Sequence, residues 1–415
     1  MSSYPKWEDF LSADIDSWRN TTMGELFAHR QEKNRPELPL LSVTGEGGVV
    51  DRDSLDRRDT SNADKSKYLR VSEGDIVYNT MRMWQGVSGV AQKDGLVSPA
   101  YTVLEPKETI ASSFAKYLVK DKRLVQVFHK NSQGLVDDTL NLKFANLNPI
   151  RVKIPPLPEQ KKIASILTTV DEVIENTQKQ NDKLQDLKKA TMNELLTKGI
   201  GHTKFKDSEL GRIPKSWEVY ALSEIGTFSK GRGISKKETL LEGVPCLRYA
   251  EIYTVYDFHI KTFKSFISPI TAESSRKLIK NEIIFAGSGE TVEDIGKSVA
   301  FTLDCDAYVG GDSVVFSPRS GLDSIFLSYQ LNDNIRRRML RKLGQGSSVI
   351  HIYSSGLQEV LVSLPPLSEQ KKIASILISM GEAIEEKLEE SRKLQSLKKS
   401  LMQDLLTGKV RVNVN

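Results

Sequence analysis

The feature that most constrains the fold of this chain is a long string that occurs twice. Residues 154–199 begin IPPLPEQKKIASIL, and residues 364–409 begin LPPLSEQKKIASIL. The register is constant over both copies, so that Pro155 corresponds to Pro365. A shared string as long as EQKKIASIL does not recur by chance in 415 residues. An internal repeat of this kind predicts a chain built from two similar halves.

Each copy is predicted to form one long helix with marked ends. Pro158 suits the first helical position of the first copy, and Ser368 suits the N-cap of the second. Gly199 and Gly408 are expected C-terminal caps, because glycine readily adopts the left-handed conformation that ends a helix. Roughly 38 helical residues would span about 57 Å at 1.5 Å per residue.

Apolar residues recur along both copies at heptad-like spacing, which is typical of a coiled-coil pair. The predicted inner faces comprise Ile163, Ile166, Val170, Val173, Leu184 and Leu187, then Ile373, Ile376, Met380, Leu394, Leu397 and Leu401. The alternative is two separate amphipathic helices, each packed on its own domain. It is less favoured, because a small domain cannot cover a stripe along a whole helix of this length.

Composition restricts the class of protein. A chain of 415 residues with 39% hydrophobic and 27% charged residues indicates two or three globular domains. There is no apolar run long enough for a membrane span, and the first residues lack the apolar core of a signal peptide. Cys246 and Cys305 alone cannot form a disulfide framework or a cysteine zinc site; they fit the cytosol, and both are expected in the core. A net charge of +5 implies that any nucleic-acid contact comes from local patches.

The segments before the two helices show the same order of predicted elements. The first segment has a short strand, a strand region, a helix and a final strand, at residues 73–79, 97–106, 112–130 and 149–154. The second repeats this order with little identity, at residues 279–289, 309–318, 325–343 and 357–366. The chain is therefore predicted to run domain (1–153), helix (154–199), domain (200–363), helix and tail (364–415).

Topology follows from this order. Because the termini of a domain usually lie close together, the second helix is expected to begin where the first ends and to run back antiparallel. The predicted fold class is α/β (mixed α+β), with two domains separated by an antiparallel pair of long coiled-coil helices and related by a pseudo-twofold axis. The tail, residues 409–414, is expected to return to the first domain and to fill the place that residues 200–205 fill for the second.

The strings PPLPEQKKIASIL and PPLSEQKKIASIL, the phrases IPKSWE, EGDIV and KNEII, and the LLTG helix ends resemble specificity subunits of type I restriction–modification systems. The resemblance implies two target-recognition domains, each reading one half of a bipartite, asymmetric sequence in double-stranded DNA. It also implies that the helices set the spacing and hold two methyltransferase (modification) subunits, which a motor-nuclease (restriction) subunit can join. Such a subunit performs no chemistry and needs no cofactor. The first domain departs from the pattern, since Asp16-Ser17-Trp18 stands where an IPxxW phrase is expected.

Enzyme motifs are incomplete in this sequence. Gly296-Lys297-Ser298 could end a P-loop, but the first glycine of that motif would fall on Thr291. The five histidines show no metal-ligand spacing. Asp137-Asp138 could bind magnesium, although a solvated loop is the favoured interpretation. An autonomous enzyme and a metal site are therefore not expected.

Local basic clusters are the candidate DNA contacts of the second domain. Arginines suit both phosphate anchoring and bidentate contact with guanine. One cluster precedes a glycine-rich loop and comprises Arg336, Arg337, Arg338, Arg341 and Lys342, followed by Gln345. A second lies in a glycine-containing loop and comprises Lys230, Arg232, Lys236 and Lys237. A solvated helix face is an equally weighted interpretation of the first cluster.

The first domain offers a similar set. The candidates are Arg30, Lys33 and Arg35, then Arg57 and Arg58, then Arg82, Trp84 and Gln85, and finally Lys130 and Gln133. Trp84 could equally belong to the core. Glutamine side chains can read adenine edges, but a base cannot be assigned to any side chain from the sequence.

The identical helix starts are candidate subunit contacts, because identical surfaces at twofold-related positions can bind two copies of one partner. They comprise Pro155, Glu159, Gln160, Lys161 and Lys162, with Pro365, Glu369, Gln370, Lys371 and Lys372. For the lysines the alternative is plain helix solvation. For the whole protein the alternative is a coiled-coil scaffold that presents two protein-binding domains and has no DNA role.

Overall fold

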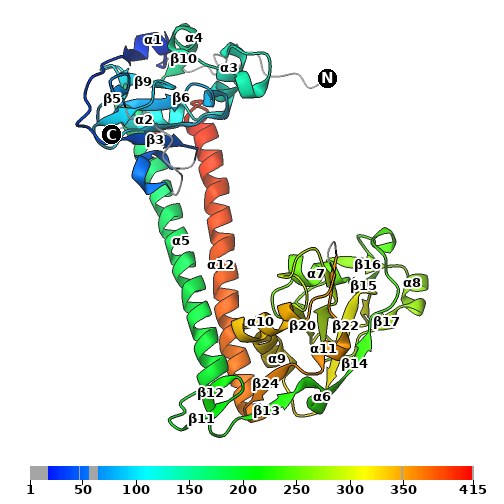
Figure 1. The fold of residues 1–415 in the computed structure, drawn as a ribbon. Helices are drawn as coiled ribbons and strands as arrows, with labels where there is room; N and C mark the ends of the chain where they lie inside the picture. The colour runs from blue at the N-terminus through cyan, green and yellow to red at the C-terminus, as the bar shows by residue number, and fades with distance from the viewer. Residues whose placement is uncertain (1–16, 46, 56–63, 347–348, 414–415) are drawn as a thin grey trace. The chain divides into compact units, whose positions relative to one another are not determined.

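The computed structural model describes residues 17–45, 47–55, 64–346 and 349–413 (Figure 1). The chain divides into two compact units, and each unit combines two stretches of sequence. The first unit contains Met1–Lys179 and Leu388–Asn415, and the second contains Gln180–Lys387. Each long helix therefore contributes one part to each unit.

The first unit is built on a four-stranded antiparallel sheet. Its strand order is β2 (Phe27–Arg30), β9 (Tyr101–Pro106), β6 (Ile76–Asn79) and β7 (Ser88–Val90). Three further pairs are β1 (Arg19–Thr22) with β10 (Arg151–Ile154), β3 (Leu41–Thr44) with β4 (Gly48–Asp51), and β5 (Leu69–Val71) with β8 (Gly95–Val97). β6 is buried because it lies between two partners, and this explains its run of apolar residues.

Helices cover this sheet and close the first unit. They are α1 (Met23–Leu26), α2 (Ser112–Leu118), α3 (Lys122–Asn131) and α4 (Phe144–Leu147). The single helix predicted over 112–130 is wrong, because Asp121 interrupts it. The Asp121 carboxylate accepts hydrogen bonds from the backbone N–H groups of Arg123 (2.9 Å) and Leu124 (3.2 Å), which starts α3 as a separate helix.

The second unit repeats this plan with added elements. Its four-stranded antiparallel sheet has the order β14 (Gly226–Lys230), β22 (Ser313–Pro318), β18 (Glu282–Ala286) and β20 (Ser298–Phe301). A second four-stranded sheet has the order β16 (Ser265–Ile267), β15 (Val244–Leu247), β21 (Tyr308–Val309) and β17 (Arg276–Lys277). The remaining pairs are β11 (Phe205–Ser208) with β12 (Gly211–Pro214), β13 (Glu218–Ala221) with β24 (Leu361–Leu364), and β19 (Ser288–Gly289) with β23 (Ile350–His351).

The helices of the second unit follow the same order as those of the first. They are α6 (Leu222–Ile225), α7 (Tyr249–Thr254), α8 (Pro269–Ser274), α9 (Ser324–Leu331), α10 (Asn334–Lys342) and α11 (Ser354–Leu357). The helix predicted over 325–343 is again two helices. Asp333 starts α10 by accepting the backbone N–H of Arg336 at 2.7 Å, so Asp333 corresponds to Asp121.

Both long helices are present and end near the predicted glycines. The prediction of Ser368 as an N-cap is wrong, because the second helix already begins at Leu367, and Pro158 is the second residue of the first helix instead of the first. α5 (Leu157–Lys198) has 42 residues and α12 (Leu367–Leu405) has 39. Gly199 (φ 66°) and Gly408 (φ 70°) adopt the left-handed conformation after the helices, as expected of C-terminal caps.

Within each unit the two helix parts pack antiparallel. In the first unit the beginning of α5 and the end of α12 share one core, in which Ile163 and Leu167 lie with Leu405. In the second unit the end of α5 and the beginning of α12 share another, in which Leu196 lies with Ile373 and Leu377. The fold class predicted from the sequence is confirmed.

The predicted apolar stripe is wrong in part. Val173, Leu187 and Leu397 are exposed, at 41%, 55% and 49% of their surfaces. The positions buried on the helices include Thr177 and Asn181 instead. A straight α-helix drifts relative to a strict heptad repeat, so a fixed spacing cannot follow its buried face over this length.

The tail returns to the first unit, as predicted. The Arg411 guanidinium donates hydrogen bonds to both oxygens of the Glu159 carboxylate (2.7 and 2.8 Å) and to the Ser17 hydroxyl (2.9 Å). In the second unit the corresponding carboxylate, Glu369, accepts hydrogen bonds from the Ile200 backbone (2.9 Å), His202 (2.9 Å) and Trp217 (3.3 Å).

The two cysteines differ in their surroundings. Cys246 is buried in the core as expected, whereas Cys305 is exposed, so the expectation for Cys305 is wrong. Neither α5 nor α12 nor any other described helix combines the length and apolarity that a membrane span requires.

Candidate nucleic-acid interface

Both units place a glutamine-containing loop beside the end of their central strand. In the first unit, Gln133 and Asn141 exchange two backbone hydrogen bonds of 2.9 and 2.8 Å, and Leu142 donates its backbone N–H to the carbonyl oxygen of Thr80 (2.9 Å). Thr80 directly follows β6. These bonds fix the loop of residues 133–141 at one edge of the sheet.

The second unit builds the same arrangement. Gln345 and His351 exchange backbone hydrogen bonds of 2.9 and 2.7 Å, and Ile352 donates its N–H to the carbonyl oxygen of Gly287 (2.9 Å), which follows β18. Gln133 and Gln345 are therefore equivalent, and both are exposed. Each precedes a glycine with positive φ, Gly134 at 151° and Gly346 at 121°. The structure thus shows that the two loops occupy equivalent positions in their units, which the sequence alone indicated only approximately.

Two other candidates of the first unit lie next to this loop. Trp84 belongs to the turn η3 (Met83–Gln85), which packs against α3. Its indole is half-buried, donates to the carbonyl oxygen of Met81 at 3.0 Å and packs edge-on against His129 (5.6 Å between ring centroids). Arg82, just before this turn, is exposed. Arg82, Trp84 and Gln133 are thus grouped at one edge.

In the second unit a cavity of about 250 Å³ opens beside the loop. Lys230, at the end of β14, lines it together with Ser288, His351 and Tyr353. His351 Nδ1 and the Ser288 hydroxyl are 2.8 Å apart, and half of the Tyr353 side chain is exposed. Sequence reasoning missed these three residues. The signal that could have found His351 is its correspondence with Asn141 after the shared Gln-Gly pair.

Arg336 is not available to DNA, which corrects the prediction for this residue. Only 1% of its surface is exposed. Its guanidinium forms an ion pair with Asp333 (2.6 Å) and donates hydrogen bonds to the carbonyl oxygen of Leu361 (3.3 Å) and the hydroxyl of Ser363 (3.1 Å). Arg336 therefore anchors α10 to β24.

Arg337 is also engaged within the protein. It donates to the carbonyl oxygens of Ile295 (2.8 Å) and Glu293, and so holds the loop that follows β19. Burial lowers the pKa of Arg337, and the neighbouring charge of Arg341 lowers it further. Arg338, Arg341 and Lys342 are exposed at the surface.

The remaining basic candidates are dispersed. Arg232 donates to the carbonyl oxygen of Ser274 at 2.9 Å, and Lys236 and Lys237 lie exposed in a short turn. Arg57 and Arg58 lie outside the described residues.

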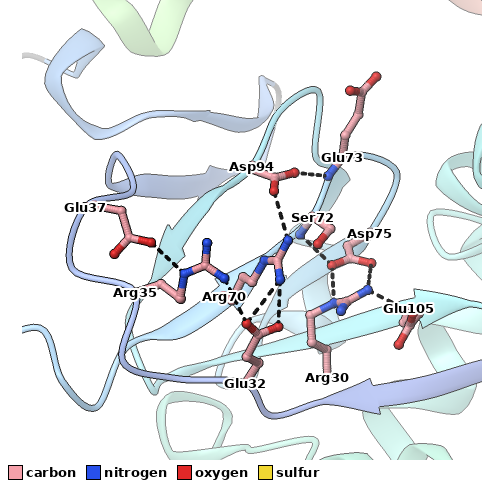
Figure 2. Close-up of polar contacts among 10 residues, drawn as sticks. All are labelled: Arg30, Glu32, Arg35, Glu37, Arg70, Ser72, Glu73, Asp75, Asp94 and Glu105. Atoms are coloured by element: carbon pink, nitrogen blue, oxygen red, sulfur yellow. Dashed lines mark hydrogen bonds and ion pairs between the residues drawn. The ribbon is translucent and has the colours of Figure 1, made fainter.

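Arg30 and Arg35, which the sequence offered as DNA contacts, belong to an ion-pair network in the first unit (Figure 2). Arg30 binds the buried Asp75 at 2.8 Å and Glu105 at 3.0 Å. Arg70 binds Glu32 at 2.9 Å, and Glu32 also binds Arg35 at 3.3 Å. Because Asp75 precedes β6 whereas Thr80 follows it, this network lies at the other end of the central strand from the glutamine loop.

The second unit has a buried carboxylate at the equivalent position, which pairs with an arginine from a different element. Glu282, at the start of β18, accepts the guanidinium of Arg276 at 2.6 Å and the backbone N–H of Ile279 at 2.8 Å. Asp75 likewise accepts the backbone N–H of Ser72 at 2.7 Å. The shared carboxylate has a structural role, since it orders the turn into the central strand in both units.

The predicted subunit contacts divide into two groups. Four of the ten side chains are exposed, namely Lys161, Lys162, Lys371 and Lys372. Pro155, Pro365, Glu159, Gln160 and Gln370 are buried and Glu369 is half-buried, so these six predictions are corrected.

The two glutamines among them are internal anchors. Gln160 accepts the backbone N–H of Ala111 (2.9 Å) and donates to the carbonyl oxygens of Thr109 and Pro155 (3.0 and 2.9 Å). Gln370 accepts the backbone N–H of Asp323 (2.9 Å) and donates to the carbonyl oxygen of Pro365 (2.8 Å). Each glutamine therefore holds the residue before α2 or α9 against the start of a long helix.

Comparison with known proteins decides the family. The model of the type I restriction modification DNA specificity domain matches residues 16–186 and again residues 214–395. The chain belongs to this family. The resemblance expected from the repeated helix starts is confirmed, and the protein is a DNA specificity subunit without catalytic activity of its own.

Relatives of this DNA specificity subunit match over most of their length. The MjaVIII specificity subunit of Methanocaldococcus jannaschii is 30% identical over 84% of this chain and 84% of the relative. The putative MjaX specificity subunit of the same organism is 30% identical over 92% of this chain and 89% of the relative.

Two solved structures share the fold. The type I restriction–modification S subunit from M. genitalium aligns over 98% of this chain and 99% of that chain, with a TM-score of 0.55 and 17% identity. A chain from a structure of type I R-M complex assembly and conformational transition aligns over 95% and 99%, with a TM-score of 0.56 and 16% identity.

Proposed function

We propose that this specificity subunit recognises a bipartite, asymmetric sequence in double-stranded DNA, with one domain for each half-site. Residues 1–153 and 200–363 are the two target-recognition domains, and the long helices lie between and after them. The observation that carries the proposal is the pair of equivalent loops that present Gln133 and Gln345. The residues around them differ between the units, with Arg82 and Trp84 in one and Lys230, His351 and Tyr353 in the other. Two loops with the same backbone arrangement but different side chains are suited to reading two different half-sites.

The helices provide two equivalent surfaces for a partner. Lys161 and Lys162 correspond to Lys371 and Lys372, and the exposed Leu187 corresponds to the exposed Leu397. Two such surfaces suit two copies of one protein. The partners are two methyltransferase subunits, in a complex that a motor-nuclease subunit can join.

The test is sequence-selective DNA binding by the chain assembled with its methyltransferase subunits. Gln345→Ala should relax selectivity at positions of one half-site, by about 1–3 kcal/mol against the wrong base, and leave the other half-site unchanged. Selection from a randomised duplex library measures both half-sites at once. The control is Gln358→Ala, which changes an exposed residue between α11 and β24. This variant should bind DNA as the unmodified chain does. Binding without sequence preference would favour the scaffold alternative instead.

A further inference from the structure

The cavity of about 250 Å³ beside the glutamine loop of the second unit is lined by one lysine and one carboxylate. These are Lys230 and Asp312, and both side chains are exposed. Within the described part of the chain, neither side chain forms an ion pair or a hydrogen bond with another residue. The cavity therefore presents a free donor and a free acceptor of opposite charge.

The sheet brings both residues to the edge where the loop is attached. Lys230 is the last residue of β14, which pairs antiparallel with β22, and Asp312 immediately precedes β22. The N–H of Gly287, just after β18, donates to the carbonyl oxygen of Asp312 at 2.9 Å, and the carbonyl oxygen of Gly287 accepts the N–H of Ile352. Asp312 is therefore connected through one residue to the loop that presents Gln345.

The backbone of Asp312 adopts a left-handed conformation, with φ at 57°. This conformation disfavours residues with a Cβ atom, and glycine adopts it most readily. Gly310 and Gly311 occupy the two positions before Asp312 in the same turn. The turn itself does not require an aspartate, whereas a role of the carboxylate in binding accounts for the unfavourable backbone.

The first unit has the same backbone arrangement without the two charges. Thr80 donates its N–H to the carbonyl oxygen of Ala100 at 3.2 Å, so Ala100 corresponds to Asp312. The pairing register of β2 with β9 matches that of β14 with β22, and it places Gln31 at the position of Lys230. The lysine and the carboxylate therefore belong to one domain only, as expected of residues that read the half-site of that domain.

We propose that Lys230 and Asp312 read a guanine–cytosine pair in the half-site of the second domain, an inference that rests on the proposed function. In the major groove guanine presents the acceptors O6 and N7, and cytosine presents the donor N4. The Lys230 ammonium donates to guanine, and the Asp312 carboxylate accepts from the cytosine amino group. Because a carboxylate repels phosphates, its presence favours a base edge over the DNA backbone as its partner. Adenine also presents an acceptor and a donor, but guanine is the base with which lysine pairs most often.

The test uses the chain assembled with its methyltransferase subunits and selection from a randomised duplex library. Asp312→Asn should reduce the preference for cytosine at one pair by about tenfold and admit adenine in its place, because asparagine pairs with adenine N6 and N7. Lys230→Met should reduce the preference for guanine at the same pair by about tenfold. Both variants should leave the other half-site unchanged.

A second variant separates loss of the contact from misfolding. Asp312→Gly removes the carboxylate and suits the left-handed backbone, so it should lose the cytosine preference without gaining adenine. The charge control is Asp304→Asn, which changes an exposed carboxylate between β20 and β21 and should leave selectivity unchanged.

The outcomes distinguish this inference from the proposed function. Unchanged selectivity at every position in both Asp312 variants, an affinity change that is equal for all sequences, or relaxation at an adenine–thymine pair would overturn the inference while the proposed function stands. A lack of sequence preference in the unmodified chain would overturn both.

Discussion

Gln160 and Gln370 connect each domain of the specificity subunit to a long helix, and their roles become visible only at the level of single atoms. Replacement of Gln160 by alanine leaves the backbone N–H of Ala111 and the carbonyl oxygens of Thr109 and Pro155 without this partner. We expect Gln160→Ala to lower the free energy of unfolding of the first unit by about 1–3 kcal/mol. Chemical denaturation followed by circular dichroism measures the loss. The control is Lys161→Ala at the next, exposed position, which should change stability by no more than about 0.5 kcal/mol. Equal effects of the two changes would contradict the anchoring role.

The ion pair between Arg30 and Asp75 gives a second prediction at this scale. Asp75 is almost fully buried, so removal of its arginine leaves an uncompensated charge. Arg30→Met should destabilise the first unit by about 3–5 kcal/mol. Arg35→Ala breaks an exposed pair with Glu37 and should cost less than about 1 kcal/mol. Thermal unfolding of both variants separates the two cases, and a small loss in Arg30→Met would show that Asp75 does not depend on this pair.

Single side chains were the hardest part of the site to predict. Arg336 and Arg341 lie on one short basic helix, yet Arg336 is buried and Arg341 is exposed. The difference depends on Ser363 and Leu361 of β24, which are distant in the sequence and meet Arg336 only after folding. Composition identified a basic helix, but the packing decides which of its charges can reach DNA.

At the scale of elements, the repeat made the long helices and their glycine caps predictable. The central strands β6 and β18 were also predictable, because their apolar runs follow turn residues. The breaks at Asp121 and Asp333 were missed, since apolar periodicity continues across each N-cap. Residues 255–264 could not be placed, because nothing local shows that Phe258 stacks on Tyr329.

The exposed lysines at the helix starts give a prediction about assembly. Reversal of Lys161 and Lys162 together with Lys371 and Lys372 to glutamate should weaken binding of methyltransferase subunits, because both equivalent surfaces change sign. We expect about a tenfold loss or more, measured by calorimetry. The control is Lys183→Glu with Lys393→Glu, a second equivalent pair that is also exposed on α5 and α12. Unchanged affinity and stoichiometry in the fourfold variant would leave only a solvating role for these lysines.

For the whole molecule, the repeat explains why two domains with little sequence identity share one arrangement of strands and helices. Each unit combines the beginning of one long helix with the end of the other, and a carboxylate at the helix start receives the returning chain. The glutamine loop and the buried carboxylate at the turn into the central strand recur in both units. The side chains around the loops differ, and we propose that they set the sequence specificity.

If each domain reads its own half-site, exchange of one domain should change one half of the recognition sequence only. The junction follows Ile154, so that β10 stays with its partner β1. Residues 1–154 are replaced by the corresponding segment of a relative with a different target. The chimaera is produced together with the methyltransferase subunits in a host cell, and methylated sites are mapped across the host genome. We expect one half of the recognition sequence to change to that of the donor while the other half stays the same. A change in both halves, or in neither, would contradict it.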